Sequence, residues 1–354
     1  MKLKIIISFC FFICVAFLLI SATQDDGFGP YSPTPLKFII PKDWPKPPTN
    51  IFAKNKLTEE GFQLGKKLFY DSRLSKDKEV SCASCHQPFA AFSTFDHDLS
   101  HGVANTFTTR NAPTLMNLAW MKEMHWDGGI NHIEVQPLSP LTAPNEMGSS
   151  LDSVLIFLES DTEYPRMFKK AFGDANINSQ RMLKALAQFT GSLVTYNSKY
   201  DRVMNGKDSF NRFEKQGYEL FKANCASCHK EPLFTDNSFR NNGRPLNRLN
   251  DIGRMAITGL NSDSLKFKVP SLRNVQVSYP YMHDGSIFSV PQVVDHYIKV
   301  TSAQPTGLDS NLSRPIRLSP LQKNQISYFL YTLTDTSFTK SKRFGPDGPV
   351  YFKH

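Results

Sequence analysis

The pentapeptide Cys82-Ala-Ser-Cys-His86 recurs unchanged as Cys225-Ala-Ser-Cys-His229. The segments before the two copies are also alike: Gly65-Lys-Lys-Leu-Phe69 precedes the first, and Gly217-Tyr-Glu-Leu-Phe221 precedes the second. Self-similarity of this kind predicts two related structural units in one chain. We expect the boundary between them in the polar stretch 197–208.

The pentapeptides have the spacing of a c-type haem attachment site. Two thiols three positions apart can add to the two vinyl groups of one haem, and the histidine that follows is then close enough to ligate the iron. Cys-x-x-Cys alone would also suit a redox dithiol or half of a zinc site. Two copies followed directly by histidine favour haem. We therefore predict two covalently bound c-type haems, one on Cys82, Cys85 and His86 and the other on Cys225, Cys228 and His229.

The composition is that of a folded protein rather than a disordered tail. The chain has 354 residues, of which 40% are hydrophobic and 21% are charged. This length allows about two domains. The formal net charge is +9, but the basic residues are spread along the chain, so the sequence gives little support for nucleic-acid binding.

The N-terminus has the pattern of an export signal. Two lysines precede the apolar run 5–20, and the small residues Ser21 and Ala22 follow it. We predict a signal peptide over residues 1–22. The alternative is an uncleaved membrane anchor formed by residues 5–20, because the run is near the short limit for a membrane span. In both cases we expect the remainder of the chain in the periplasm.

Periodicity predicts a mainly helical chain after an extended, proline-rich arm over residues 23–50. A helix should begin after Thr58 as its cap and end near Asp71, and another should follow Ser179. Two more are expected, one over the apolar positions 213–221 and one that begins at Pro320. Because long alternating strand patterns are absent, the predicted fold class is all-α.

The helix over 213–221 is indicated by Phe213, Gly217, Leu220 and Phe221, which recur at helical spacing. The helix that begins at Pro320 has Ser319 as its cap, and we expect it to bury Leu321 with the later apolar residues of the same segment.

The stretch from Cys82 to Gly148 resembles the bacterial di-haem cytochrome c peroxidase and MauG family. The resemblance extends over roughly residues 40 to 335. It implies two cytochrome c-like domains, 51–200 and 201–354, each with one haem and packed across a common interface. The matching segments are Arg110-Asn-Ala-Pro-Thr114, Trp126-Asp-Gly128, Glu146-Met147, Val269-Pro-Ser-Leu-Arg-Asn274 and Pro280-Tyr-Met-His-Asp-Gly285.

The resemblance implies a peroxide site at the N-terminal haem. Glu146 would be the acid/base that takes a proton from one peroxide oxygen and returns it to the leaving one, with Gln136 as its polar neighbour. Trp126 would fill the gap between the haems and assist electron transfer. The alternatives are a helix-capping or surface carboxylate for Glu146 and ordinary core packing for Trp126.

Two further features follow from the same resemblance. Asn111, with the backbone carbonyls of Ser278 and Pro280, matches a calcium site, since oxygen ligands suit this hard cation. His101 falls near the position of a removable distal histidine that blocks the peroxide haem in some members. The alternative for His101 is an ordinary loop residue.

At the C-terminal haem the resemblance bears on the sixth iron ligand. Peroxidases place a methionine 14 residues after the His-Asp-Gly histidine, which is His283 here, whereas this chain has Tyr297. MauG-like members have tyrosine at this position, and a phenolate ligand lowers the potential of the iron. The neighbouring His296, or a free sixth site, is the alternative.

The resemblance therefore implies a di-haem peroxidase of the MauG-like branch. It would reduce hydrogen peroxide to water with electrons from a small cytochrome c or a cupredoxin. One alternative is a MauG-like enzyme that uses peroxide to oxidise a partner protein, and another is a non-catalytic di-haem electron carrier. A homodimer remains an open expectation.

Overall fold

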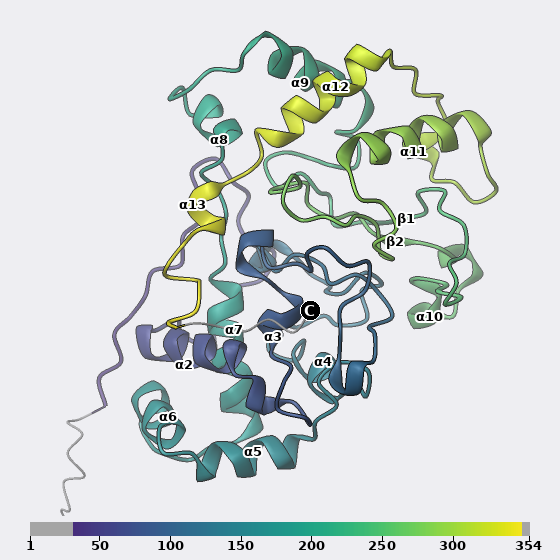
Figure 1. The fold of residues 1–354 in the computed structure, drawn as a ribbon. Helices are drawn as coiled ribbons and strands as arrows, with labels where there is room; N and C mark the ends of the chain where they lie inside the picture. The colour runs from purple at the N-terminus through teal and green to yellow at the C-terminus, as the bar shows by residue number, and fades with distance from the viewer. Residues whose placement is uncertain (1–30, 349–354) are drawn as a thin grey trace, which may run out of the picture. The chain divides into compact units, whose positions relative to one another are not determined.

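The computed structural model describes residues 31–348 (Figure 1). The predicted signal or anchor segment and the first part of the arm lie outside these residues. Within the described range, no helix combines the length and apolar character needed to span a bilayer. Residues 33–348 form one compact unit, which holds the features described below.

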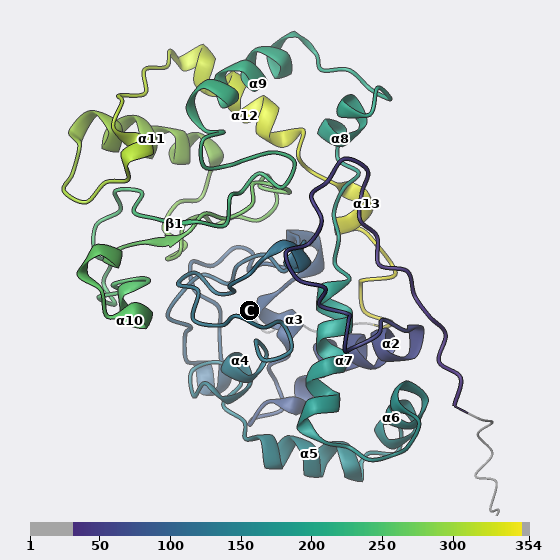
Figure 2. The ribbon, with the colours of Figure 1, turned by 180° about the vertical axis from the view of Figure 1, so that it is seen from behind.

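The described chain is mostly helical, as the periodicity predicts, with one small sheet of two antiparallel strands in which Phe239 lies opposite Lys268 (Figures 1 and 2). The strands are β1 (Phe239–Arg240) and β2 (Phe267–Lys268). The helices are α2 (Glu59–Tyr70), α3 (Cys82–Cys85), α4 (Leu138–Thr142), α5 (Leu151–Ser160), α6 (Tyr164–Phe172), α7 (Ser179–Gly191), α8 (Lys199–Met204), α9 (Arg212–Asn224), α10 (Met255–Thr258), α11 (Val290–Ala303), α12 (Pro320–Tyr331) and α13 (Thr336–Thr339).

The predicted helix starts are confirmed where a capping side chain marks them. Thr58 accepts a hydrogen bond from the backbone N–H of Gly61 at the start of α2, and Ser319 caps α12 in front of Pro320. One burial prediction is wrong. Leu321 is 55% exposed, because it lies in the first turn of α12 on the solvent side.

The internal repeat of the sequence is also a repeat of helix packing. Helix α2 crosses α7 at Gly65, where a Cβ atom would overlap the carbonyl oxygen of Ala185 and lie 3.0 Å from Cβ of Phe189. Helix α9 crosses α12 at Gly217, where a Cβ atom would overlap the carbonyl oxygen of Gln325 and lie 3.0 Å from the corresponding phenylalanine, Phe329. Glycine is needed at both crossings because only hydrogen leaves room for the opposite backbone.

Two hydrophobic clusters surround these crossings. The first includes Phe62, Leu68 and Phe189 from α2 and α7, and the second includes Phe221 and Phe329 from α9 and α12. The described part of the arm, 33–50, runs without a helix and packs aromatic side chains against Trp120, whose indole N–H donates to the carbonyl of Pro45 at 2.7 Å.

The segment 336–348 packs on the first hydrophobic cluster rather than on the second. Phe338 of α13 belongs to the first cluster, and its ring lies 5.7 Å from that of Phe92 between centroids. Beyond it, Tyr70 donates a hydrogen bond to the carbonyl of Phe344 at 2.7 Å, and Lys66 forms an ion pair with Asp347 at 2.6 Å. In Figure 1 this yellow segment passes from α12 to the region of α2.

Candidate functional site

A cavity of about 720 Å³ brings the two pentapeptides together. Cys85 and His86 line it from the first half of the chain, and the second half contributes Cys225, Cys228 and His229. Residues that are 140 positions apart in the sequence therefore share one enclosed space.

Both histidines are arranged as metal ligands with a second hydrogen bond. Nδ1 of His86 donates to the carbonyl of Phe92 at 2.9 Å, and Nδ1 of His229 donates to the carbonyls of Phe234 and Pro270, each at 3.2 Å. These bonds fix the ring orientation and leave Nε2 for a metal, as is common for ligating histidines. Burial lowers the pKa of His86 to about 4 and also lowers that of His229, so burial favours the neutral form of both rings.

The four pentapeptide cysteines and one arginine of the cavity wall also suit bound haem. All four cysteines are free thiols, and burial raises the pKa of Cys82 and of Cys225 to about 12. Arg240 lines the cavity and pairs with Asp236 and Asp309, but its buried Nε has no hydrogen-bond partner. A haem propionate would supply the missing acceptor, because buried donors are rarely left unpaired.

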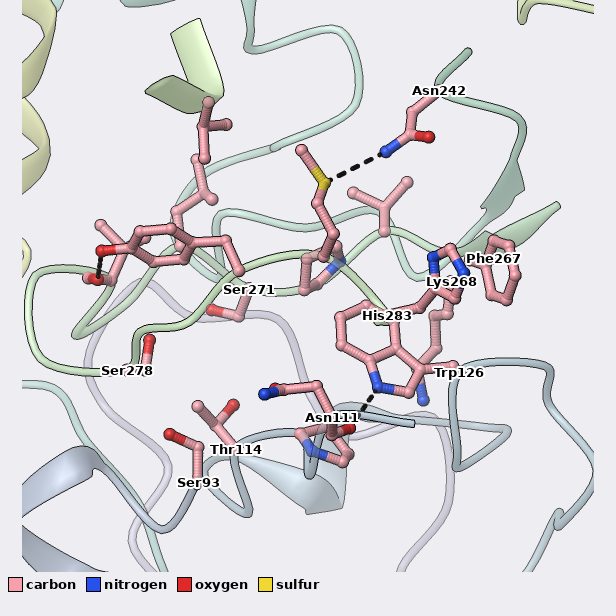
Figure 3. Close-up of a pocket in the computed structure, with 18 of the residues that line it drawn as sticks. Ser93, Asn111, Thr114, Trp126, Asn242, Phe267, Lys268, Ser271, Ser278 and His283 are labelled. Carbon is pink, nitrogen blue, oxygen red and sulfur yellow. Dashed lines mark hydrogen bonds between the residues drawn. The ribbon is translucent and has the colours of Figure 1, made fainter. Parts of the chain in front are cut away.

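Trp126 lies where the two halves meet (Figure 3). Its indole N–H donates to the backbone carbonyl of Asn111 at 2.8 Å, and its own carbonyl accepts a hydrogen bond from the N–H of Lys268 in β2 at 2.7 Å. Trp126 is thus fixed by contacts to both halves, and it lines the cavity.

Glu146 lines the cavity close to the first pentapeptide, after the end of α4. Burial raises the pKa of its carboxyl, and Glu146 in turn raises the pKa of the Cys82 and Cys85 thiols through its charge. Its backbone is held on both sides, since its N–H donates to Ala143 and its carbonyl accepts from Val103 at 2.8 Å. A half-buried carboxyl with a raised pKa can both accept and return a proton near neutral pH.

Gln136 also lines the cavity, and its side chain is hydrogen-bonded to Nε2 of His125 at 3.3 Å. His125 directly precedes Trp126 but is not among the site residues predicted from the sequence. A polar residue beside a motif that faces the cavity is the signal that would have found it.

Tyr297 lines the cavity from α11, whereas His296 does not. Burial raises the pKa of the Tyr297 phenol to about 12, and the nearby Cys225 and Cys228 thiols add to this effect. His296 is instead hydrogen-bonded through Nε2 to the carbonyl of Asn242 at 3.0 Å. The fold therefore brings the tyrosine, and not the neighbouring histidine, to the second pentapeptide.

The remaining predicted site residues are divided between the cavity and its surroundings. Asn111, Ser278 and Pro280 all line the cavity, and the Asn111 side-chain amide donates to the carbonyl of Asp98 at 3.1 Å. His101 does not line it; its ring packs against that of Phe107, with 4.7 Å between centroids.

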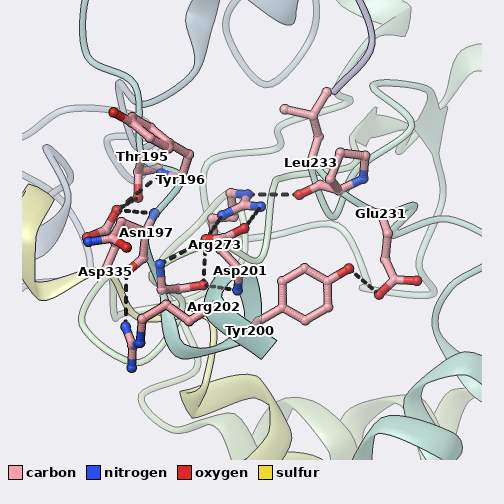
Figure 4. Close-up of polar contacts among 12 residues, drawn as sticks. Thr195, Tyr196, Asn197, Tyr200, Asp201, Arg202, Glu231, Leu233, Arg273 and Asp335 are labelled. Atoms are coloured by element: carbon pink, nitrogen blue, oxygen red, sulfur yellow. Dashed lines mark hydrogen bonds and ion pairs between the residues drawn. The ribbon is translucent and has the colours of Figure 1, made fainter. Parts of the chain in front are cut away.

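The segment 269–274, which is part of the family resemblance, has a structural role at the junction of the two halves (Figure 4). Arg273 is fully buried and forms two hydrogen bonds to the carboxylate of Asp201, at 2.7 and 2.9 Å. Nearby, the carboxylate of Asp335 accepts hydrogen bonds from Thr195 and from the backbone N–H of Tyr196. These contacts connect α8 to the segment between β2 and α11, and the segment after α7 to the segment after α12.

The fold and the cavity define a predominantly helical protein with two c-type haem-attachment motifs in one cavity wall. The family model described as "Di-haem cytochrome c peroxidase" matches residues 59–209. The chain is 36% identical over 319 residues to the methylamine utilization protein MauG of Methylorubrum extorquens, which covers 88% of each protein. It is also 36% identical over 248 residues to the cytochrome c551 peroxidase of Nitrosomonas europaea, covering 66% of this chain and 71% of that protein.

The solved structures give the same relationship. A MauG-like protein associated with microbial copper homeostasis superposes with a TM-score of 0.80 at 30% identity, over 88% of this chain and 99% of that one. The chain therefore belongs to the di-haem cytochrome c peroxidase and MauG family. Its relatives include both peroxidases and MauG proteins.

Proposed function

We propose that this protein reduces hydrogen peroxide to water at the haem held by Cys82, Cys85 and His86, with electrons from an external donor. The observation that carries the proposal is the single cavity, in which a haem-attachment motif with a protonatable carboxyl lies beside a second such motif. The reaction consumes two electrons and two protons for each peroxide and forms two water molecules. The haem iron, when bound, would supply the site where peroxide binds and is reduced.

The protein's own part in the reaction is proton transfer and exclusion of water. Glu146 would accept the proton of the peroxide oxygen nearer the iron and deliver it to the departing oxygen, so that the O–O bond breaks unevenly. Burial raises the pKa of this carboxyl, which favours the return of the proton. Gln136 would be the polar neighbour of Glu146 in the cavity.

Electrons would enter at the C-terminal haem and reach the N-terminal site by way of Trp126. The indole N–H of Trp126 is hydrogen-bonded to Asn111 and its backbone carbonyl to Lys268, and these two bonds support a fixed ring position between the motifs. Small redox proteins such as a cytochrome c or a cupredoxin are donors of the right class. With this scheme we also propose two haem domains over 51–200 and 201–354, a periplasmic location, and calcium at Asn111, Ser278 and Pro280.

Tyr297 favours a second candidate function, in which peroxide is used to oxidise a partner protein. A phenolate ligand would stabilise an oxidised C-terminal iron, and the position of Tyr297 beside Cys225 and Cys228 supports this role. The third candidate, a carrier without turnover, needs His101 as a permanent ligand. The packing of His101 against Phe107 outside the cavity lining gives that candidate no support.

Spectra and steady-state kinetics of the holoprotein test the proposal. A high-spin ferric signal and peroxide-dependent oxidation of a reduced small cytochrome c are expected. Two low-spin haems that stay inert to peroxide, even after partial reduction, would contradict it. In the same preparation, Tyr297→Phe should change the absorption of the C-terminal haem only; an unchanged spectrum would place the sixth ligand elsewhere.

A further inference from the structure

His125 has no role in the scheme above, yet it lies in the cavity wall with Gln136 and Glu146. It is a separate residue from His101, the histidine that the sequence singles out for this haem. His125 also lies near enough to His86 that a protonated His125 would lower the pKa of His86. The histidine that the fold brings to the first haem-attachment motif is therefore His125.

The backbone holds His125 in an unusual conformation. Its φ is 63°, in the left-handed region that residues with a side chain rarely adopt. The loop is closed by an antiparallel bridge between Met124 and Ile130, in which the Met124 N–H donates to the Ile130 carbonyl at 2.6 Å. Such a backbone costs free energy, and residues of this kind cluster at functional sites.

The imidazole is fixed by one side chain. The Gln136 amide is hydrogen-bonded to Nε2, and Nδ1 makes no hydrogen bond to any other part of residues 31–348. When Gln136 donates to Nε2, the proton of a neutral ring is on Nδ1. One ring nitrogen is thus occupied by Gln136, and the other is left with a proton to donate.

Burial and the nearby positive charges favour the neutral form of His125. Burial lowers its pKa, and the positive charges of Lys268 and Arg110 act in the same direction, against the opposing effect of Asp127. Lys268 is itself buried and donates to the carbonyl of Glu123 at 2.9 Å. A neutral donor is appropriate here because it adds no charge next to the carboxyl of Glu146.

We propose that His125, oriented by Gln136, donates a hydrogen bond from Nδ1 to the ligand bound at the iron of the N-terminal haem. The inference rests on the proposed function and divides its tasks: Glu146 moves the proton, and His125 orients the peroxide and stabilises the charge that develops on it.

Cyanide binding to the ferric holoprotein tests this role without turnover, because bound cyanide accepts a hydrogen bond from a distal donor. His125→Asn removes the imidazole and keeps a residue type that tolerates the left-handed backbone. Its cyanide dissociation constant at the N-terminal haem should rise about tenfold, as expected for the loss of one hydrogen bond to a charged ligand. The matched control is His132→Asn, an exposed histidine of the same region that does not line the cavity.

Gln136→Leu tests the orientation of the ring from a different segment, and it keeps the imidazole if His125→Asn does not fold. It should also weaken cyanide binding, and the double variant should bind no more weakly than His125→Asn alone, because both changes remove the same interaction. The carbon monoxide complex of the reduced protein gives a second measurement: its C–O stretching frequency should rise in both variants.

Wild-type cyanide affinity in both variants would overturn the inference. So would conversion of the resting haem from low spin to high spin in His125→Asn, because His125 would then be an iron ligand. A wild-type protein that binds cyanide and consumes peroxide, beside an unchanged His125→Asn variant, refutes only this inference. A wild-type protein that does neither refutes the proposed function as well.

Discussion

At the scale of single residues, the environment of Glu146 decides how it can act. An exposed glutamate is almost fully ionised at neutral pH and returns a proton poorly. Burial next to the first pentapeptide raises the pKa of Glu146, and a carboxyl with a pKa nearer the working pH is a better acid and base. Burial of a carboxylate without a partner costs free energy, so a carboxylate without a function is usually found at the surface.

Glu146→Gln should slow peroxide cleavage by roughly a hundredfold or more, because the amide cannot accept the proton. In the wild type, the rate should fall as the pH is lowered through the raised pKa of Glu146, since protonation removes the base. This acidic limb should be lost in Glu146→Gln. Stopped-flow kinetics with peroxide at several pH values measure both effects. An unchanged rate in the variant would remove Glu146 from the reaction.

At the scale of secondary-structure elements, the two helix crossings are the structural form of the sequence repeat. Gly65 and Gly217 permit the backbones of α2 and α7, and of α9 and α12, to touch at the same relative position. Each crossing lies before a pentapeptide in the chain: Cys225 follows α9 directly, whereas Cys82 begins the separate short helix α3. Helix packing therefore explains why glycine recurs at Gly65 and Gly217.

Gly217→Ala should lower the free energy of unfolding by about 2 kcal/mol, because the added methyl group overlaps the carbonyl of Gln325. In a helix with open space the same exchange would raise the free energy of unfolding by about 1 kcal/mol. A decrease therefore indicates that the added methyl group overlaps the neighbouring backbone. Gly65→Ala should behave alike. Gly348→Ala has open space and is the control, with a change of less than about 0.5 kcal/mol. Denaturant unfolding followed by circular dichroism gives the values, and a more stable Gly217→Ala would contradict the crossing.

At the scale of the whole molecule, the chain end connects the two halves. Residues after α12 leave the second hydrophobic cluster and pack on the first, where Phe338 contacts Phe92. The carbonyl of Phe92 accepts the hydrogen bond of His86. The C-terminal segment therefore supports the residue that orients the first iron ligand.

Phe338→Ala should lower the free energy of unfolding by about 3 to 5 kcal/mol, as expected for a buried phenylalanine. It should also perturb the spectrum of the N-terminal haem more than that of the C-terminal haem. Phe213→Ala, at an exposed phenylalanine, is the control and should leave both properties nearly unchanged. Thermal unfolding and difference absorption spectra measure the two effects; equal perturbation of both haems would argue against this support.

The sequence by itself determined the two haem-attachment motifs, the helical class and the family, because covalent attachment chemistry and helix capping depend on residues that are close in the chain. The mispredicted burial of Leu321 has the opposite cause: periodicity does not show which side of the first helical turn faces solvent. The position of the chain end on the first cluster has no local signal at all.

The composition of the cavity was decided by the tertiary structure. His125 and His101 are the same residue type, and only the fold shows that His125 lines the cavity and His101 does not. The fold likewise brings Tyr297, and not the neighbouring His296, into the cavity wall. The meeting of residues from both halves around Trp126 depends on long-range contacts with Asn111 and Lys268. Local sequence fixes what the two motifs can bind, and long-range packing fixes which side chains surround the bound group.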